Sequence, residues 1–222
     1  MNNMKKVISF SVYGDNPKYT IGLIRNLELI EKIYPDWVTY VYYNNTVPNE
    51  ILEKVNHFHN VETFDMTELE IPGMFWRFQP NDDKEVERFI VRDSDSRITE
   101  REKIAVEEWE KEDKVLHIMR DHPHHNYQIL GGMWGMKTQT DFNMKEEFSR
   151  YTNSKELYEK MTDMNFLRDV IYPKYVQNST VHATYHGYEP WAKEFSSPLV
   201  EKRFIGEIIN EDESREYHYT LI

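Results

Sequence analysis

Two aspartates separated by one residue carry the strongest chemical signal in the chain. Asp93 and Asp95, with Ser94 between them, directly follow the apolar run 89–91, Phe-Ile-Val, which is typical of a buried β-strand. Ligands of open α/β sheets bind beyond the carboxyl ends of the strands, so we expect both carboxylates at the rim of a binding crevice. Two hard oxygen ligands that leave open positions suit Mg²⁺ or Mn²⁺ held together with a phosphate group. The alternative interpretation is an ordinary turn, in which Asp and Ser side chains bond their own backbone.

The segments around these acids alternate between strand and helix patterns. Strands are expected at 6–12, 37–43, 61–64 and 115–119, in addition to the run before Asp93, and helices at 18–34, 48–58 and 99–112. This order is typical of an α/β fold with a mostly parallel central sheet flanked by helices. Further on, we expect helices across 143–172, one of them capped by Ser154, and short strands at 180–185 and 204–209.

The composition limits the class of protein. A chain of 222 residues, of which 39% are hydrophobic, can bury one sizeable core and most simply forms one domain. The formal net charge of -12 argues against nucleic acid and anionic membranes as partners, and it favours a bridging cation for any diphosphate ligand. The absence of cysteine excludes disulfides and thiolate zinc sites. The apolar run at the N-terminus is too short for a signal peptide or a membrane span, so we expect a cytoplasmic protein.

Aromatic and basic residues in the first half could contact a ligand. Phe10, Tyr13 and Tyr19 lie near the end of the first expected strand, where their rings could stack on a base, although core packing is the alternative for Phe10. Arg77 lies within the aromatic segment 73–80. It could reach a phosphate while its stem is packed, or it could belong to an amphipathic core helix.

A histidine-rich loop and a glycine-rich stretch follow the strand expected at 115–119. Three histidines lie within 122–125, and Pro123 among them favours a loop that faces a sugar over a zinc site. The glycines of the stretch 131–136 would permit close backbone approach to a ligand, with Trp134 as an apolar platform.

Two later residues each have a structural and a functional interpretation. Asp163 either caps the helix that follows it or acts as a catalytic or sugar-binding carboxylate. His182, on an expected strand, is either structural or a further ligand for a cation already held by two carboxylates.

Taken in order, the motifs of the chain resemble a known family. They are MFWRF (74–78), IVRDSDSRIT (90–99), HIMRDHP (117–123), ILGGMWGMK (129–137), Asp163 followed by Phe166-Leu167, and IYP (171–173). The series spans about 6–206 and is similar to GT-A fold glycosyltransferases of bacterial and large-DNA-virus glycan clusters, most of all to the small single-domain enzymes that viruses use to glycosylate their capsid proteins.

The resemblance implies the GT-A, Rossmann-like fold of nucleotide-diphospho-sugar transferases. It also implies a single glycosyltransferase domain, 1–222, with a nucleotide-binding half at 1–98, an acceptor- and sugar-binding half at 99–210 and a polar tail at 211–222.

The resemblance further implies roles for particular residues. In such families the two acids bind Mn²⁺ or Mg²⁺ and a late histidine completes the metal shell, so the implied metal ligands are Asp93, Asp95 and His182, with His186 in reserve. The implied donor-binding residues are Phe10, Ser11, Tyr13, Asp65, Arg77, Asp93, Ser94, Asp95, Gly132 and Trp134. The candidates for orienting the donor sugar or the acceptor hydroxyl, and hence for catalysis, are Asp121 and Asp163.

The chain departs from the family at two positions. Related retaining enzymes often have Asp-Gln where this chain has Asp163-Met164. The wider group has a lysine where Glu189 precedes Pro190-Trp191. Stabilisation of the leaving group would then require another basic residue, for which the candidates are Lys193, Lys202 and Arg203.

The expected activity is metal-dependent transfer of a sugar from a nucleoside diphosphate donor, most commonly a UDP-sugar, to a glycan or glycoprotein acceptor in viral capsid or surface glycan synthesis. The resemblance favours retention of configuration. The alternatives are a noncatalytic module that binds nucleotides or glycans, a D-x-D phosphatase and a sugar nucleotidyltransferase. The last two fit less well, because the acids do not follow the first strand and the loop 13–15 is not a basic, glycine-rich phosphate loop.

Overall fold

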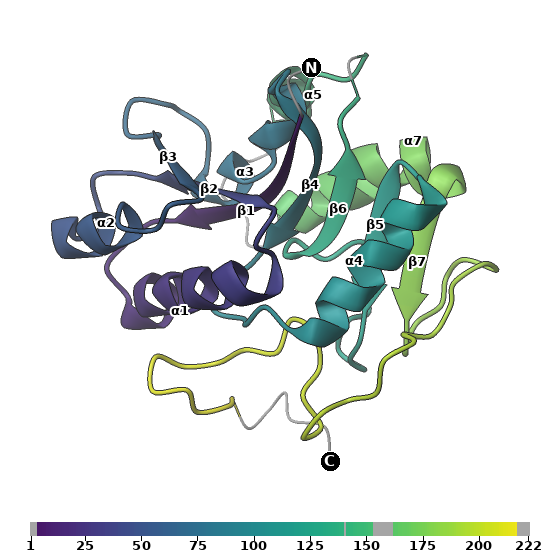
Figure 1. The fold of residues 1–222 in the computed structure, drawn as a ribbon. Coiled ribbons are helices and arrows are strands. Elements are labelled where there is room, and N and C mark those ends of the chain that lie inside the picture. Colours follow the sequence, from purple (N-terminus) through teal and green to yellow (C-terminus); the bar gives the residue numbers. More distant parts are fainter. Residues whose placement is uncertain (1–3, 140, 153–161, 217–222) are drawn as a thin grey trace.

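The computed structural model describes residues 4–139, 141–152 and 162–216. Its central feature is a seven-stranded sheet with helices on both faces (Figure 1). The strands are β1 (Lys5–Val12), β2 (Val38–Tyr43), β3 (Val61–Asp65), β4 (Val86–Arg92), β5 (Leu116–Arg120), β6 (Met133–Lys137) and β7 (Ser179–Ala183). They lie in the order β3-β2-β1-β4-β6-β5-β7, in which β6 is antiparallel to both neighbours and the other pairs are parallel. The expected α/β fold with a mostly parallel sheet is confirmed.

The helices form two layers, one on each face of the sheet. They are α1 (Pro17–Ile33), α2 (Asn49–Val55), α3 (Gly73–Trp76), α4 (Glu100–Glu112), α5 (Met144–Thr152), α6 (Thr162–Phe166) and α7 (Tyr172–Tyr175), with a π-helical turn at Leu167–Ile171 and 3₁₀ turns at Gln79–Asp82 and Val176–Asn178. Helices α1, α2 and α4 contribute to the hydrophobic cluster on one face, and α3, α5 and α6 to the cluster on the other. No helix in the described ranges is long and apolar enough to cross a membrane.

The central strands are apolar on both faces because helices cover both. In β1, Ile8 and Phe10 pack in the α1 layer, while Val7 packs in the opposite layer. In β4, Ile90 packs in the α1 layer and Phe89 in the other. Strand β4 therefore reads as a continuous apolar run over 89–91, whereas Ser9 and Ser11 interrupt the apolar residues of β1. The polar residues that follow the run in β4 mark the edge of the sheet.

Strand β6 is the largest difference from the expected elements. No strand is expected from the sequence in the glycine-rich stretch 131–136, whose glycines are expected to approach a ligand. A Cβ on Gly135 would lie 2.8 Å from the backbone oxygen of Phe89, so close pairing of β4 with β6 requires a glycine there. Trp134 lies in this strand with no exposed surface, and its ring packs edge-on against Phe78 and Phe89. Trp134 is thus a core residue and not the ligand platform that the sequence suggested.

The second half of the chain differs in two further details. Helices α5 and α6 fall within the expected stretch 143–172, whereas α7 starts at its last residue and continues through Pro173 to Tyr175. Ser154 and the rest of 153–161 lie outside the described residues. In place of the strand expected at 204–209, the chain is irregular, with an isolated bridge between Ile209 and Arg215. Gly206, at a φ of 81°, interrupts the extended conformation that a strand would need.

Candidate active site

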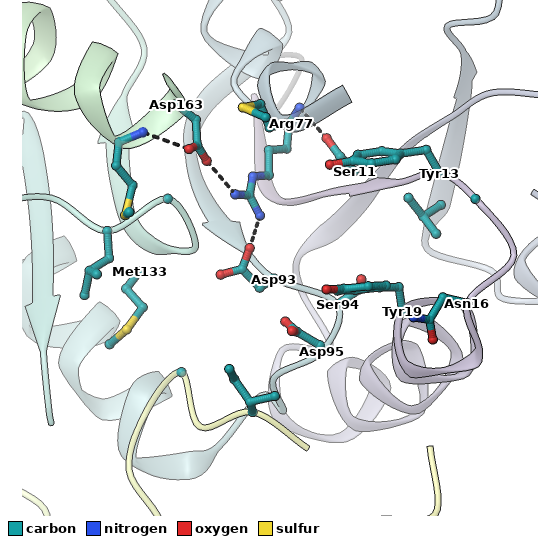
Figure 2. Close-up of a pocket in the computed structure, with 18 of the residues that line it drawn as sticks. Ser11, Tyr13, Asn16, Tyr19, Arg77, Asp93, Ser94, Asp95, Met133 and Asp163 are labelled. Atoms are coloured by element: carbon teal, nitrogen blue, oxygen red, sulfur yellow. Dashed lines mark hydrogen bonds and ion pairs between the residues drawn. The ribbon is translucent and has the colours of Figure 1, made fainter. Parts of the chain in front are cut away.

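A cavity of about 690 Å³ opens beyond the carboxyl ends of β1 and β4, next to the residues that precede β6 (Figure 2). This volume is typical of sites for small molecules and cofactors. Six of the expected donor-binding residues line it, together with the expected catalytic residue Asp163. The six are Ser11, Tyr13, Arg77, Asp93, Ser94 and Asp95.

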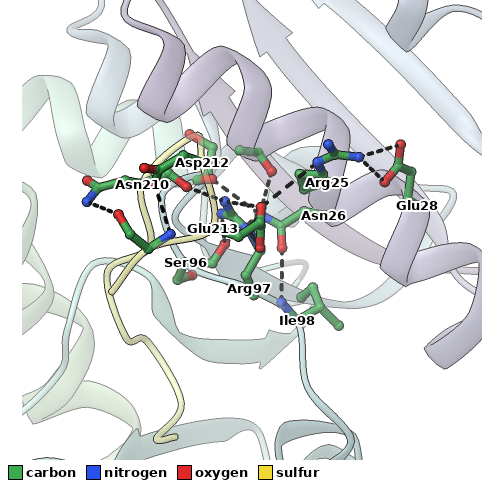
Figure 3. Close-up of polar contacts among 12 residues, drawn as sticks. Arg25, Asn26, Glu28, Ser96, Arg97, Ile98, Asn210, Asp212 and Glu213 are labelled. Carbon is green, nitrogen blue, oxygen red and sulfur yellow. Dashed lines mark hydrogen bonds and ion pairs between the residues drawn. The ribbon is translucent and has the colours of Figure 1, made fainter. Parts of the chain in front are cut away.

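Helix α1 fixes the loop that carries the two acids, residues 93–98, which we call the acidic loop. Asn26 of α1 is buried and donates from Nδ2 to the backbone oxygens of Ser94, at 3.3 Å, and Ser96, at 2.8 Å. Its Oδ1 accepts a hydrogen bond from the Ile98 N–H at 2.9 Å (Figure 3). A buried amide with satisfied partners on both sides holds the loop in one conformation.

The sequence analysis missed Asn26, although the chain contains a signal for it. Asn26 lies between the apolar residues Leu23 and Leu27 on the buried face of α1, where a polar side chain requires a hydrogen-bonding partner. One turn earlier, a Cβ on Gly22 would lie 2.2 Å from the Ser94 backbone oxygen, so the helix touches the acidic loop directly.

Arg77 links the acidic loop to Asp163. Its guanidinium is almost fully buried and forms ion pairs with Asp93 through Nη1 and with Asp163 through Nη2, the latter at 3.2 Å (Figure 2). The backbone N–H of Arg77 donates to Ser11 Oγ at 3.0 Å, which ties it to the end of β1. Burial raises the pKa of Asp163, against the opposing effect of the Arg77 charge. One fixed cation therefore holds two carboxylates in the wall of the cavity.

Asp95 is the more enclosed of the two acids in the loop. Its side chain is 15% exposed, compared with 45% for Asp93. Burial, together with the charge of Asp93, raises the pKa of Asp95 to about 6. Lys18 Nζ lies 4.0 Å from an Asp95 oxygen but makes its closer ion pair with Glu216. The negative charge of the two acids is thus only partly compensated by the protein.

The acidic loop fits a divalent cation that is shared with a ligand. Within the described part of the chain, no group of three or more His, Asp or Glu side chains is placed to hold a metal ion. Asp93 and Asp95 nevertheless supply two hard carboxylate ligands at a cavity wall, which suits Mg²⁺ or Mn²⁺ when phosphate oxygens or water complete the coordination.

The structure does not bring His182 to the acidic loop. His182 lies in β7 with no exposed surface, its Nδ1 is 3.0 Å from Nε2 of His117, and its Nε2 is 3.0 Å from a carboxylate oxygen of Glu108. Both ring nitrogens are engaged inside the protein, so this position does not fit the predicted third metal ligand. The reserve candidate His186 is exposed, and its Nε2 lies 2.6 Å from the Pro123 carbonyl oxygen, away from the cavity lining.

Asp121 is a structural carboxylate, contrary to the predicted catalytic role. It has no exposed surface and accepts two hydrogen bonds from Arg101, at 2.9 and 2.8 Å. It accepts two more, from Thr184 Oγ1 at 2.8 Å and from the Ile205 N–H at 3.0 Å. Four donors occupy its two oxygens, which leaves it unavailable to a substrate proton.

Besides Trp134, three expected donor-binding residues do not line the cavity. Phe10 belongs to the core under α1, and Asp65 is exposed at the end of β3, where it accepts a hydrogen bond from the Thr67 N–H at 2.9 Å. Gly132 lies against the acidic loop, since a Cβ on it would be 2.0 Å from Asp93 Oδ2. Its close approach is therefore to a protein carboxylate.

The C-terminal segment, residues 204–216, closes one side of the cavity, and three of its residues line it. The Ile209 N–H donates to the Asp95 backbone oxygen at 2.8 Å. Arg97 of the acidic loop forms an ion pair with Glu213 at 3.0 Å (Figure 3). The sequence predicts a polar tail from residue 211 onward, but the chain up to residue 216 packs on the acidic loop, and the remaining residues lie outside the described ranges.

The basic residues considered for the leaving group lie elsewhere. Lys193 forms ion pairs with Glu108 at 2.9 Å and Glu112 at 2.7 Å, and neither Lys202 nor Arg203 is among the lining residues. The cavity lining contains Arg77 and, among the described residues, no lysine and no other arginine.

Comparison with solved structures identifies the fold. No protein-family model and no curated protein sequence matches the chain. The galactosyltransferase LgtC, solved with donor and acceptor sugar analogues, superposes with a TM-score of 0.53 at 11% identity, over 78% of this chain and 72% of that chain. The chain has the GT-A glycosyltransferase fold.

Two further structures support this fold. An active-site mutant of LgtC matches with a TM-score of 0.55 at 10% identity, over 88% of this chain and 84% of that chain. A glycosyltransferase involved in the glycosylation of the major capsid of PBCV-1 matches with a TM-score of 0.50 at 15% identity, over 81% of each chain. The GT-A fold implied by the sequence motifs is therefore confirmed, and the activity must be argued from the site.

Proposed function

We propose that this protein is a metal-dependent glycosyltransferase that moves a sugar from a nucleoside diphosphate donor to a glycan or glycoprotein acceptor. The observation that carries the proposal is the position of Asp93 and Asp95 in the wall of a cavity at the carboxyl end of β4, within a GT-A fold. A turn with no further role would not require two carboxylates to share a cavity while burial raises the pKa of one of them.

The donor nucleotide would lie between the start of α1 and the acidic loop. Tyr13 and Tyr19 line this end of the cavity and are 47% and 39% exposed, so their rings are available to stack on a base. Mn²⁺ or Mg²⁺ held by Asp93 and Asp95 would neutralise the charge that develops on the departing diphosphate. The guanidinium of Arg77 would add a fixed positive charge beside it. The family resemblance favours UDP as the nucleotide.

The transfer breaks the bond between the sugar C1 and a diphosphate oxygen, which keeps the electron pair. A new bond forms between C1 and the acceptor oxygen, and the proton of the acceptor hydroxyl passes to the departing diphosphate or to solvent. Figure 2 shows Asp163 on the side of Arg77 away from the two tyrosines, and we assign it to orienting the donor sugar or the acceptor hydroxyl. Asp121 has no part in this proposal because its oxygens are occupied.

The acceptor class rests on resemblance. The sequence motifs are similar to those of enzymes that glycosylate viral capsids, and one of the matching structures is a glycosyltransferase involved in the glycosylation of the major capsid of PBCV-1. We therefore propose a glycan or glycoprotein acceptor in viral capsid or surface glycan synthesis.

Thermal unfolding with nucleotides tests the donor site. UDP, GDP, CDP and dTDP are added with and without Mn²⁺ to the wild type, to the double variant Asp93→Asn with Asp95→Asn, and to Asp65→Asn as an exposed control. We expect one nucleotide to raise the Tm only with Mn²⁺, in the wild type and the control but not in the double variant. An assay for release of that nucleotide from its nucleotide sugars then distinguishes an enzyme, which releases it, from a binding module, which does not. A folded wild type that responds to none of the four contradicts the proposal.

A further inference from the structure

His125 lines the cavity together with Leu130, Met133 and Phe204, a set that we call the far wall, and the fold fixes the hydrogen-bonding state of its ring. The backbone N–H of Asp121 donates to Nδ1 of His125 at 3.0 Å. Because only an unprotonated ring nitrogen accepts a hydrogen bond, the proton of the neutral imidazole is on Nε2. Burial, and next the neighbouring His122, lowers the pKa of His125 to about 3, so the ring is neutral near pH 7. His125 therefore offers one N–H donor, at Nε2.

Further contacts hold this ring in place. The His125 backbone N–H donates to the His122 carbonyl oxygen at 2.9 Å, which closes a tight turn. The His125 ring lies edge-on to Phe204, with ring centroids 5.5 Å apart. Asp121 also accepts the Ile205 N–H on its carboxylate, so one buried residue orients both the histidine loop and the C-terminal segment. The far wall is thus built around Asp121.

The surroundings of His125 suit a sugar. Its Nδ1 is turned toward the Asp121 amide, so the ring edge with Nε2 faces away from that amide, and the residue lines the cavity. Leu130, Met133 and Phe204 line the same wall. A donor beside three apolar side chains fits a sugar ring, whose C–H face packs on apolar groups while a hydroxyl oxygen accepts the hydrogen bond.

We propose that His125 Nε2 donates a hydrogen bond to a hydroxyl oxygen of the transferred sugar and that His125 is a specificity-determining residue. The inference rests on the proposed function, because the far wall meets a sugar only if the cavity holds a nucleotide sugar. Asp121 is then a positioning residue that acts through His125. The site would discriminate against a sugar that lacks this hydroxyl, because the buried donor would be left unpaired.

Substitution of His125 by asparagine or by glutamine separates the roles of the two ring nitrogens. His125→Asn keeps an acceptor near the position of Nδ1 for the Asp121 N–H but has no donor at the position of Nε2. His125→Gln keeps a donor near Nε2 but lacks the acceptor at Nδ1. His57→Asn, at an exposed histidine whose Nδ1 lies 2.6 Å from the Glu53 carbonyl oxygen, is the matched control.

Calorimetric titration with Mn²⁺ present compares UDP with UDP-glucose, UDP-galactose and UDP-N-acetylglucosamine. We expect His125→Asn to keep the Tm, to weaken the best-bound nucleotide sugar about 10-fold and to weaken UDP less than about 2-fold. His125→Gln should retain most of the sugar affinity at a lower Tm, and His57→Asn should change neither. Equal losses for UDP and the nucleotide sugar in His125→Asn, or no loss, would overturn the inference and leave the proposed function intact. A wild type that binds none of these ligands would overturn both.

Discussion

Arg77 Nη2 and a carboxylate oxygen of Asp163 form an ion pair at 3.2 Å, although the two residues are 86 positions apart in the chain. The pair joins the segment after α3 to helix α6 at the wall of the cavity. Both side chains are largely buried, so each compensates a charge that would otherwise be costly to keep away from water.

The losses of stability on removing the two members of this pair should not be additive. We expect Arg77→Met to lower the free energy of unfolding by about 3 kcal/mol, because it leaves Asp163 buried and unpaired. The double variant Arg77→Met with Asp163→Asn should lose less than the sum of the two single losses. Denaturant unfolding of the four proteins measures the coupling. Additive losses would show that the two side chains do not stabilise each other.

Asn26 should control both stability and cation binding. Asn26→Leu keeps the volume but removes the hydrogen bonds to the Ser94 and Ser96 oxygens and from the Ile98 N–H. The Ser96 oxygen keeps its bond from Arg97 Nη1, whereas the other two groups lose this partner, so we expect a loss of about 2 kcal/mol in stability. Nucleotide binding that depends on Mn²⁺ should weaken at least about 10-fold as the carboxylates lose their fixed positions. The control is Glu31→Leu, at an exposed position of the same helix. A destabilised Asn26→Leu protein with unchanged affinity would mean that the loop keeps its conformation without this contact.

The C-terminal segment should detach when its anchor is removed. Arg97→Ala deletes the ion pair with Glu213 and the hydrogen bond to the Asn210 carbonyl oxygen. We expect faster hydrogen exchange at the Ile209 amide and faster proteolysis within 206–216. Glu211→Ala, at an exposed position of the same segment, should leave both rates unchanged. Equal protection in the two variants would show that the segment stays in place without Arg97.

Buried histidines should make the protein less stable in mild acid. Burial is the main cause that lowers the pKa of His117 and of His182 below the usual 6.5. Below pH 6.5 the unfolded chain binds protons that the folded chain does not, so stability is full above this pH and falls as the pH decreases. Each such histidine lowers the free energy of unfolding by at most about 1.4 kcal/mol for each unit by which the pH falls.

The slope of stability between pH 6.5 and 5 tests this linkage. Glu108, which contacts His182, has a pKa lowered to about 2, so its own contribution is lost only at more acidic pH. His117→Gln should reduce the slope, whereas His59→Gln, at an exposed histidine, should preserve it. A slope that His117→Gln leaves unchanged would place the proton uptake elsewhere.

The sequence predicts most elements of the fold because the central strands are buried on both faces. The expected strand 6–12 and helix 18–34 agree with β1 and α1 to within one residue at each end. Strand β6 could not be predicted in this way, because the glycine that allows its close pairing with β4 also removes the apolar pattern.

Side-chain roles depended on contacts between distant segments. Asp93 and Asp121 both follow an apolar strand, but Arg101 and Thr184 occupy only the second carboxylate. Likewise, pairing of β5 with β7 places His182 beside His117, and this pairing cannot be predicted from the sequence around either histidine. The acidic motif and Asp163 could be found from sequence because strand ends and helix starts are local features.

The contact between Gly22 and the Ser94 carbonyl has a mechanical consequence. Because a Cβ at Gly22 would come within 2.2 Å of that oxygen, α1 and the acidic loop touch backbone to backbone and form one rigid floor. The C-terminal segment, in contrast, is held to α1 and the acidic loop partly by the side chains of Lys18 and Arg97. We expect entry and exit of a ligand to proceed by a hinged movement of the C-terminal segment over a stationary base.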